Sequence, residues 1–159
     1  METTQLTGTA HYQQPGWFTR NVFNRAIAVS TRLGLSIWGS RELRVVGRKS
    51  GEVRTTPVNL LDFEGAQYLV APRGTTQWVR NIRVAGVGEL RLGRKIQPFR
   101  AVEIADEHRV AVLRSYLRRW KMEVGVFFDG VGPDSTDEEL LAIADRHPVF
   151  RVEPTPQVA

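Results

Sequence analysis

The sequence contains no cysteine. This absence excludes disulfides, zinc–thiolate sites, iron–sulfur clusters and thiol nucleophiles, and it is compatible with a reducing compartment. The histidines are also few, and His11, His108 and His147 lack the spacing of metal ligands. We therefore expect no metal site in this protein.

Long apolar runs and several well-known catalytic motifs are absent as well. No stretch reaches the roughly 18 uncharged apolar residues that a membrane span needs, and residues 1–16 are polar and lack a signal-peptide pattern. The chain has no Walker sequence, no Gly-x-Gly-x-x-Gly and no Gly-x-Ser-x-Gly. We expect a cytoplasmic protein, with peripheral membrane contact, if any, through the amphipathic stretch from Trp17 to Leu33.

Positive charge is concentrated in the middle of the chain. The 159 residues carry a net charge of +5, but residues 41–100 alone hold 12 Lys and Arg against 5 Asp and Glu. Residues 101–159 are acidic, with 7 Lys and Arg against 11 Asp and Glu. A positive field of this kind attracts nucleic acid, an anionic lipid surface or a phosphorylated small molecule.

The length suits one domain with a real core. We expect residues 1–15 to form a flexible N-terminal arm and residues 16–159 to form a single domain. An apolar stripe predicts a helix from about Trp17 to Leu33. Thr75 or Thr76 is the expected N-cap of a short helix over residues 77–85.

Two further helices are predicted in the C-terminal third. Asp106 is expected to cap a longer helix whose buried face carries Val110, Leu113, Leu117 and Trp120. A capping box, Thr136 to Glu139, opens the last helix.

Short stretches rich in β-forming residues lie between residues 43 and 104 and are mostly linked by tight turns. The predicted strands cover residues 43–46, 53–62, 67–71, 89–92 and 96–104, and "VFRV" near the C-terminus predicts one more. This pattern favours a mainly β, α+β fold, a small antiparallel barrel with peripheral helices, over a doubly wound sheet.

A basic turn, "GRKSGE", joins the first two predicted strands. Gly51 is expected to take a positive φ angle. Arg48 and Lys49, with Arg54 on the returning strand, would surround backbone N–H groups that can bind an anion. The alternative is a solvated hairpin tip, where these residue types are common.

Pro57 interrupts the strand that follows this turn. Proline cannot donate a hydrogen bond to a neighbouring strand, so it marks either a sheet edge or a β-bulge. A bulge would leave backbone groups free to contact a ligand. At an edge, the proline would need no role other than preventing another strand from pairing there.

The segment "APRGTTQWVRN", Ala71 to Asn81, takes the chain from a strand through a cationic glycine loop into a helix. Helix N-termini favour anions. Trp78 and Asn81 are three residues apart and share a helix face, where they could pack on a heterocycle and hydrogen-bond to it. The alternative is a core tryptophan and a capping asparagine.

Taken together, "VVGRKSGEVRTTPV" and "QYLVAPRGTTQWVRNIRVAG" resemble the deazaflavin-dependent nitroreductase family, which is found mainly in actinobacteria. The resemblance covers about residues 40–105. It implies a split β-barrel of the FMN-binding type and coenzyme F420 as cofactor, a deazaflavin that carries a phosphodiester and a polyglutamate tail.

The resemblance implies cofactor-binding roles for residues of four segments: the turn, the proline strand, the glycine loop and the helix. These residues are Arg48, Lys49, Ser50, Arg54, Thr55, Thr56, Pro57, Val70, Ala71, Pro72, Arg73, Gln77, Trp78 and Asn81.

Phe127 and Phe128 stand where members that reduce nitroaromatic compounds carry tyrosines, and with Trp17 they are the candidate substrate-binding residues. Tyr116 is the candidate proton donor, beside solvent or a backbone group.

The implied activity is hydride transfer from reduced coenzyme F420 to an electrophilic, apolar small molecule such as an enone, a quinone or a nitro compound. Three alternatives remain open: a split barrel that uses flavin mononucleotide (FMN), a non-catalytic deazaflavin carrier, and a basic barrel that binds nucleic acid. We expect a small-molecule substrate and no nucleic-acid partner, in a monomer or a homodimer.

Overall fold

Six antiparallel strands close into one barrel in the computed structural model, which describes residues 39–156. Around the barrel the strand order is β1-β2-β3-β6-β5-β4. The strands are β1 (Ser40–Val46), β2 (Val53–Phe63), β3 (Ala66–Val70), β4 (Val87–Leu92), β5 (Lys95–Glu103) and β6 (Val149–Pro154). The expected split β-barrel is confirmed.

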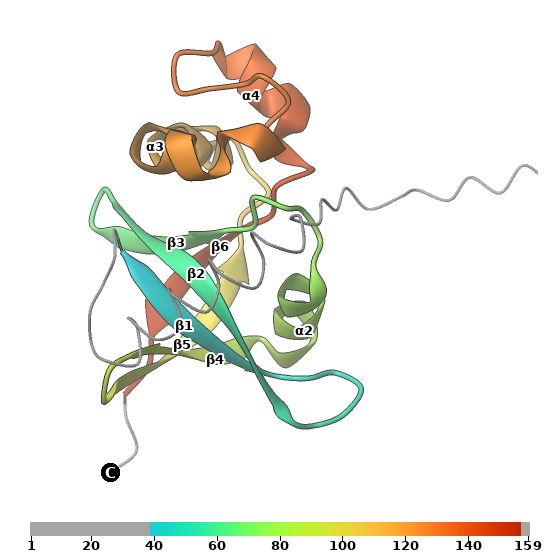
Figure 1. The fold of residues 1–159 in the computed structure, drawn as a ribbon, viewed down its shortest axis with the longest axis vertical. Coiled ribbons are helices and arrows are strands. Elements are labelled where there is room, and N and C mark those ends of the chain that lie inside the picture. Colours follow the sequence, from blue (N-terminus) through green and yellow to red (C-terminus); the bar gives the residue numbers. More distant parts are fainter. Residues whose placement is uncertain (1–38, 157–159) are drawn as a thin grey trace, which may run out of the picture.

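Helices cover one end and one side of the barrel (Figure 1). Helix α2 (Gln77–Ala85) lies beside the strands, whereas α3 (His108–Val124) and α4 (Asp137–Ala144) pack together beyond one end. A short 3₁₀ turn, η1 (Gly125–Phe127), follows α3. None of the helices within residues 39–156 is long and apolar enough to cross a membrane. The predicted N-terminal arm and the helix from Trp17 to Leu33 lie outside the described residues.

The apolar core has two parts. Inside the barrel, inward-facing residues such as Leu43, Leu69 and Phe99 are almost completely buried. A second cluster fills the space between the sheet and α3 and α4. The predicted buried face of α3 belongs to this second cluster and is confirmed: Val110, Leu113, Leu117 and Trp120 are buried.

Three helix starts were predicted from side-chain caps. At α2, Thr76 occupies the predicted N-cap position, but its side chain makes no capping hydrogen bond. At α4 the capping box is present, because the Glu139 backbone N–H donates to Thr136 Oγ1 at 3.1 Å and the Thr136 backbone N–H donates to the Glu139 carboxylate at 3.3 Å. At α3 the predicted cap is one residue off. Asp106 accepts a hydrogen bond from the His108 backbone N–H at 3.1 Å, but Glu107 occupies the N-cap position.

Strand β2 is longer than its partner β3, so the barrel is split along the part of β2 that β3 does not reach. Its first half, residues 53–59, pairs with β1, and only residues 60–63 pair with β3. Among the described residues, no strand pairs with the other side of the first half. Pro57 lies on this open edge, opposite Glu42 in an unbroken register. The edge interpretation of Pro57 is therefore confirmed, and the bulge interpretation is wrong.

Candidate functional site

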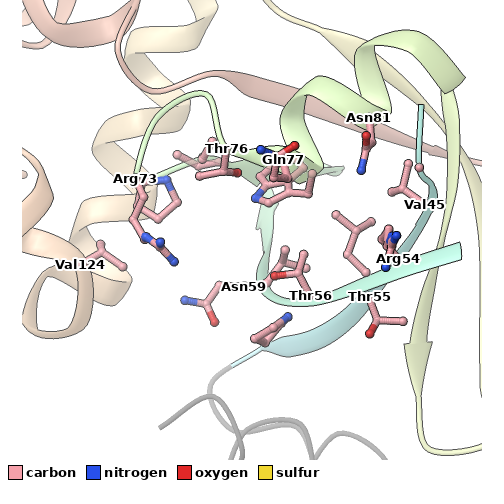
Figure 2. Close-up of a pocket in the computed structure, with 18 of the residues that line it drawn as sticks. Val45, Arg54, Thr55, Thr56, Asn59, Arg73, Thr76, Gln77, Asn81 and Val124 are labelled. Carbon is pink, nitrogen blue, oxygen red and sulfur yellow. The ribbon is translucent and has the colours of Figure 1, made fainter. Parts of the chain in front are cut away.

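A cavity of about 700 Å³ lies along the open edge of β2. Its walls come from the β1–β2 hairpin, β2, the end of β3 with the following loop, α2, and the C-terminal end of α3 (Figure 2). The cavity brings together every residue that the sequence analysis assigned to a cofactor. These are Arg48, Lys49, Ser50, Arg54, Thr55, Thr56, Pro57, Val70, Ala71, Pro72, Arg73, Gln77, Trp78 and Asn81.

The hairpin is tied to helix α2 through Arg48. The Arg48 guanidinium donates to Asn81 Oδ1 at 2.8 Å and to Gln77 Oε1 at 3.0 Å, and the Arg48 backbone N–H also donates to Asn81 Oδ1, at 3.2 Å. Gln77 and Asn81 are four residues apart, so they present both acceptors on one helix face. The cation is thus held in place before any ligand arrives.

The turn itself has little conformational freedom. The Gly47 N–H donates to the Glu52 carbonyl at 2.7 Å, and the Glu52 N–H donates to Ser50 Oγ at 3.2 Å. Gly51 has a φ of 72°, as the sequence predicted. A Cβ at Gly47 would lie 2.8 Å from Ser50 Oγ, which is too close for any side chain to fit without a shift.

Arg54 and Lys49 supply positive charge that is not committed elsewhere in the site. The nearest carboxylate to Arg54 is Glu52, 3.8 Å away, with side chains that are 61% and 75% exposed. An exposed pair at that distance contributes little. These cations can therefore turn toward an anion at the hairpin end of the cavity.

Hydrogen bonds to the segment just before β6 hold the loop after β3 in place. The Ala71 N–H donates to the Pro148 carbonyl at 2.9 Å, and His147 Nδ1 lies 2.9 Å from the Pro72 carbonyl oxygen. Because a carbonyl only accepts, Nδ1 carries the proton. His147 is fully buried and stacks on Phe128, with ring centroids 4.0 Å apart. This support was missed, because nothing in the sequence links His147 to Pro72.

Trp78 packs against the core, as the alternative interpretation predicted, and it also faces the cavity. Its ring packs on Phe150 at the edge of the barrel core, with centroids 5.7 Å apart, and its partly buried side chain also lines the cavity. A flat apolar surface at this point suits a planar ring system.

The opposite end of the cavity is formed by the C-terminal part of α3. Here Glu123 lies against β2, and the Asn59 amide donates to Glu123 Oε1 at 3.4 Å. Burial raises the pKa of Glu123, and the hydrogen bond from Asn59 partly opposes that rise. Neither residue was predicted from the sequence. Helix α3 is kinked at Trp120, between Tyr116 and Glu123, so helical spacing in the sequence gives no signal for the position of Glu123.

Tyr116, the candidate proton donor, lines the cavity but is only 2% exposed. Burial raises the pKa of its hydroxyl, the nearby Glu123 raises it further, and a hydrogen bond with Asn59 opposes both effects. A phenol in this state is a weaker acid than usual, although it can still donate a hydrogen bond.

The candidate substrate residues are separated by the fold. Phe127 lines the cavity, but Phe128 does not and is completely buried. Trp17 lies outside the described residues. Within those residues no cluster of three potential metal ligands occurs.

Solved structures share this fold at low sequence identity. The chain is similar to a structure described as "F420-H2 Dependent Reductase (FDR-A)", with 20% identity, a TM-score of 0.53, and coverage of 72% of this chain and 94% of the other. A structure described as a domain-swapped dimer has 20% identity and a TM-score of 0.54, with coverage of 86% and 97%. A protein from Agrobacterium tumefaciens has 15% identity and a TM-score of 0.51, with coverage of 91% and 58%.

The family is shown by a comparison at the level of sequence. No curated protein matches the chain. The model of the F420H(2)-dependent quinone reductase family, however, matches residues 18–127, which include every cofactor-binding residue predicted from the sequence. The chain therefore belongs to the family of F420H2-dependent quinone reductases and is an F420-dependent reductase with coenzyme F420 as its cofactor.

Proposed function

We propose that the protein transfers a hydride from reduced coenzyme F420 to a quinone, or to another flat, apolar electrophile such as an enone or a nitro compound. One observation carries this proposal: a single cavity has a cationic hairpin at one end and an apolar wall with a hydrogen-bonding pair at the other. Such a cavity suits a cofactor with an anionic tail and an acceptor with a polar oxygen.

The hairpin end would hold the anionic part of the cofactor. Arg48, Lys49 and Arg54 offer charged donors to phosphodiester and glutamate groups, and guanidinium groups match such oxygens in a bidentate manner. Because Arg48 is already bound to Gln77 and Asn81, little ordering remains to oppose binding. The residues present therefore fit coenzyme F420.

The middle of the cavity would hold the ring. Trp78 offers a flat face, Val70 and Ala71 offer apolar contacts, and the open edge of β2 around Pro57 places backbone groups along the cavity. The bound reduced cofactor supplies the hydride. The contribution of the protein is to orient the reacting groups and to exclude water from between them.

The α3 end would hold the acceptor. Val124 and Phe127 provide apolar contacts for a planar ring, and Asn59 and Glu123 provide polar atoms for its oxygen. The predicted role of Phe127 in substrate binding thus remains part of the proposal, and Phe128 is left out of it because it does not line the cavity.

The first test is a titration of the purified protein into oxidised coenzyme F420, followed by the cofactor's fluorescence, with FMN run in parallel. Selective binding of the deazaflavin is expected. Turnover is then measured with reduced F420 and a panel that contains a naphthoquinone, a cyclic enone and a nitroaromatic compound. Binding without turnover of any acceptor would favour a carrier, and binding of FMN alone would contradict the proposal.

The oligomeric state remains a separate prediction of monomer or homodimer. Light scattering on the protein used for the titration distinguishes the two, and repeating it with F420 present shows whether the cofactor changes the assembly.

A further inference from the structure

Asn59 and Glu123 lie far from the cationic hairpin. Strand β2 rises about 3.3 Å per residue, so the five steps from Arg54 to Asn59 separate the two ends of the cavity by about 17 Å. In Figure 2, Asn59, Arg73 and Val124 lie toward one side of the cavity, and Arg54 and Val45 lie toward the other. The Asn59–Glu123 pair is thus too distant to share the role of the hairpin cations.

The surroundings of Glu123 raise the pKa of its carboxyl group, and burial is the main cause. Its neighbours in the cavity wall include Val124, Phe127 and the buried ring of Tyr116. Burial in such surroundings disfavours the charged form of a carboxylate. A neutral carboxyl group can donate a hydrogen bond, and it can also give up its proton when a stronger base forms nearby.

The charged groups around Glu123 come from its own helix and from the cavity wall. On its own helix, Tyr116 lines the same cavity, and Arg119 and Lys121 are charged neighbours in the sequence. Strand β2 contributes the neutral Asn59 to the cavity wall, and the loop after β3 contributes Arg73. Among the described residues that line the cavity, Glu123 is the only one with a carboxyl group.

We propose that Glu123 is the acid of this enzyme: its carboxyl group binds the carbonyl oxygen of a quinone-type acceptor and protonates it, while Asn59 holds the carboxyl group in place. This inference rests on the proposed function and deepens it, because it assigns the acceptor subsite and the proton donor. It also replaces Tyr116, whose buried hydroxyl is the poorer acid, in the donor role.

The step balances as follows. Reduced F420 is the reductant, and it gives the acceptor two electrons as a hydride. The O–H bond of Glu123 breaks, and its proton forms a bond with the acceptor oxygen, which would otherwise carry the negative charge. For a quinone, hydride plus proton gives the hydroquinone. Glu123 is left as a carboxylate and regains a proton from solvent.

Three variants test this assignment. Glu123→Gln keeps a hydrogen-bond donor but has no proton to transfer, Glu123→Ala has neither, and Glu138→Gln makes the same charge change on the exposed face of α4, outside the cavity. Affinity of the F420-free protein for 2-methyl-1,4-naphthoquinone is measured by quenching of tryptophan fluorescence. Turnover of the same quinone is measured with saturating reduced F420.

The expected pattern separates binding from proton transfer. Glu123→Gln should bind the quinone within about threefold of the wild type, but its kcat should fall about 100-fold. The wild-type rate should fall as pH rises through the pKa of Glu123, and the rate of Glu123→Gln should show no such fall. Glu123→Ala should bind the quinone about tenfold more weakly as well. Glu138→Gln should match the wild type in every measurement.

Two results would overturn the inference. One is a Glu123→Gln enzyme with the kcat and pH profile of the wild type, and the other is equal quinone affinity in the wild type and Glu123→Ala. Loss of the proposed function would look different, because the wild type itself would then fail to bind F420. In that case the quinone-binding comparison still decides whether the subsite exists.

Discussion

Arg48 and Asn81 are joined twice. The backbone N–H and the guanidinium of Arg48 both donate to Asn81 Oδ1, at 3.2 and 2.8 Å. Asn81 is only 5% exposed. Its amide oxygen therefore fixes both the backbone of the basic hairpin and its first cation against helix α2. The position of the hairpin depends on a residue 33 positions away in the sequence.

Asn81→Ala should release the hairpin. Without the Asn81 side chain, the backbone N–H and the guanidinium of Arg48 lose their shared acceptor. Residues 47–52 should then exchange their amide hydrogens faster, and F420 should bind about tenfold more weakly. The measurements are hydrogen exchange by mass spectrometry and the fluorescence titration. Arg80→Ala is the matched control, because Arg80 is exposed on the same helix and does not line the cavity. Equal affinity in the two variants would contradict this role of Asn81.

Arg54→Ala should weaken F420 binding about tenfold, because a charge-assisted hydrogen bond to the anionic tail is lost. The affinity of the variant should also depend less on salt, since one fewer cation contributes. The comparison is Arg94→Ala, which removes an equal charge from the exposed β4–β5 turn, outside the cavity. If both variants lose affinity equally, a general positive field and not a local contact explains the binding.

Gly47→Ala should distort the basic turn, because the new Cβ would lie 2.8 Å from Ser50 Oγ and 3.2 Å from the Glu52 carbonyl oxygen. We expect a loss of about 1 to 3 kcal/mol in the free energy of unfolding, and weaker F420 binding because the turn shifts. Urea unfolding and the fluorescence titration measure the two effects. Gly125→Ala is the control for stability, since its Cβ would meet only Lys121, at an ordinary 3.5 Å. An unchanged unfolding midpoint for Gly47→Ala would show that the turn can adjust.

Phe127 and Phe128 should respond oppositely to truncation. Phe128→Ala should lower the free energy of unfolding by about 3 to 5 kcal/mol, because it empties a buried site against His147 and Tyr116. Phe127→Ala should lower the free energy of unfolding less than Phe128→Ala does, and it should instead raise KM for the acceptor. Thermal unfolding and steady-state kinetics check the pair. A larger loss of stability in Phe127→Ala would reverse the assignment.

Glu123 should make stability depend on pH. Its pKa is raised in the folded protein by burial, so the folded state holds this proton more tightly than the unfolded chain does. The resulting stabilisation is complete below the ordinary glutamate pKa and is lost as pH rises through the raised value. As pH rises, the wild type should therefore lose unfolding free energy relative to Glu123→Gln, until the two are equally stable or the variant is the more stable one. Urea titrations from about pH 4 to about pH 8 measure it, and Glu138→Gln should show no such trend.

Local patterns in the sequence were sufficient for the elements and for much of the site. The capping box at Thr136, the apolar face of α3 and the positive φ of Gly51 each depend on residues close together in the chain, and each is present. The predicted cofactor residues lie together because they belong to neighbouring strands and the helix that follows them.

Contacts between distant segments could not be predicted in this way. Three such features are the support of Pro72 by His147, the full burial of Phe128 next to the cavity-lining Phe127, and the pairing of Asn59 with Glu123. In each case the neighbouring sequence gives no sign of the contact. Two adjacent phenylalanines look alike in the sequence, and only the path of the chain after α3 separates them.

The sequence by itself determined a positively charged turn, a strand that carries a proline, and a loop leading into a tryptophan-bearing helix, because charge, backbone propensity and side-chain period are properties of short segments. The tertiary structure alone decided that β2 would extend past β3 and open a cavity along its free edge. It also brought an acid from the end of α3 to that edge, because the packing of α3 against the barrel sets which of its residues reach β2.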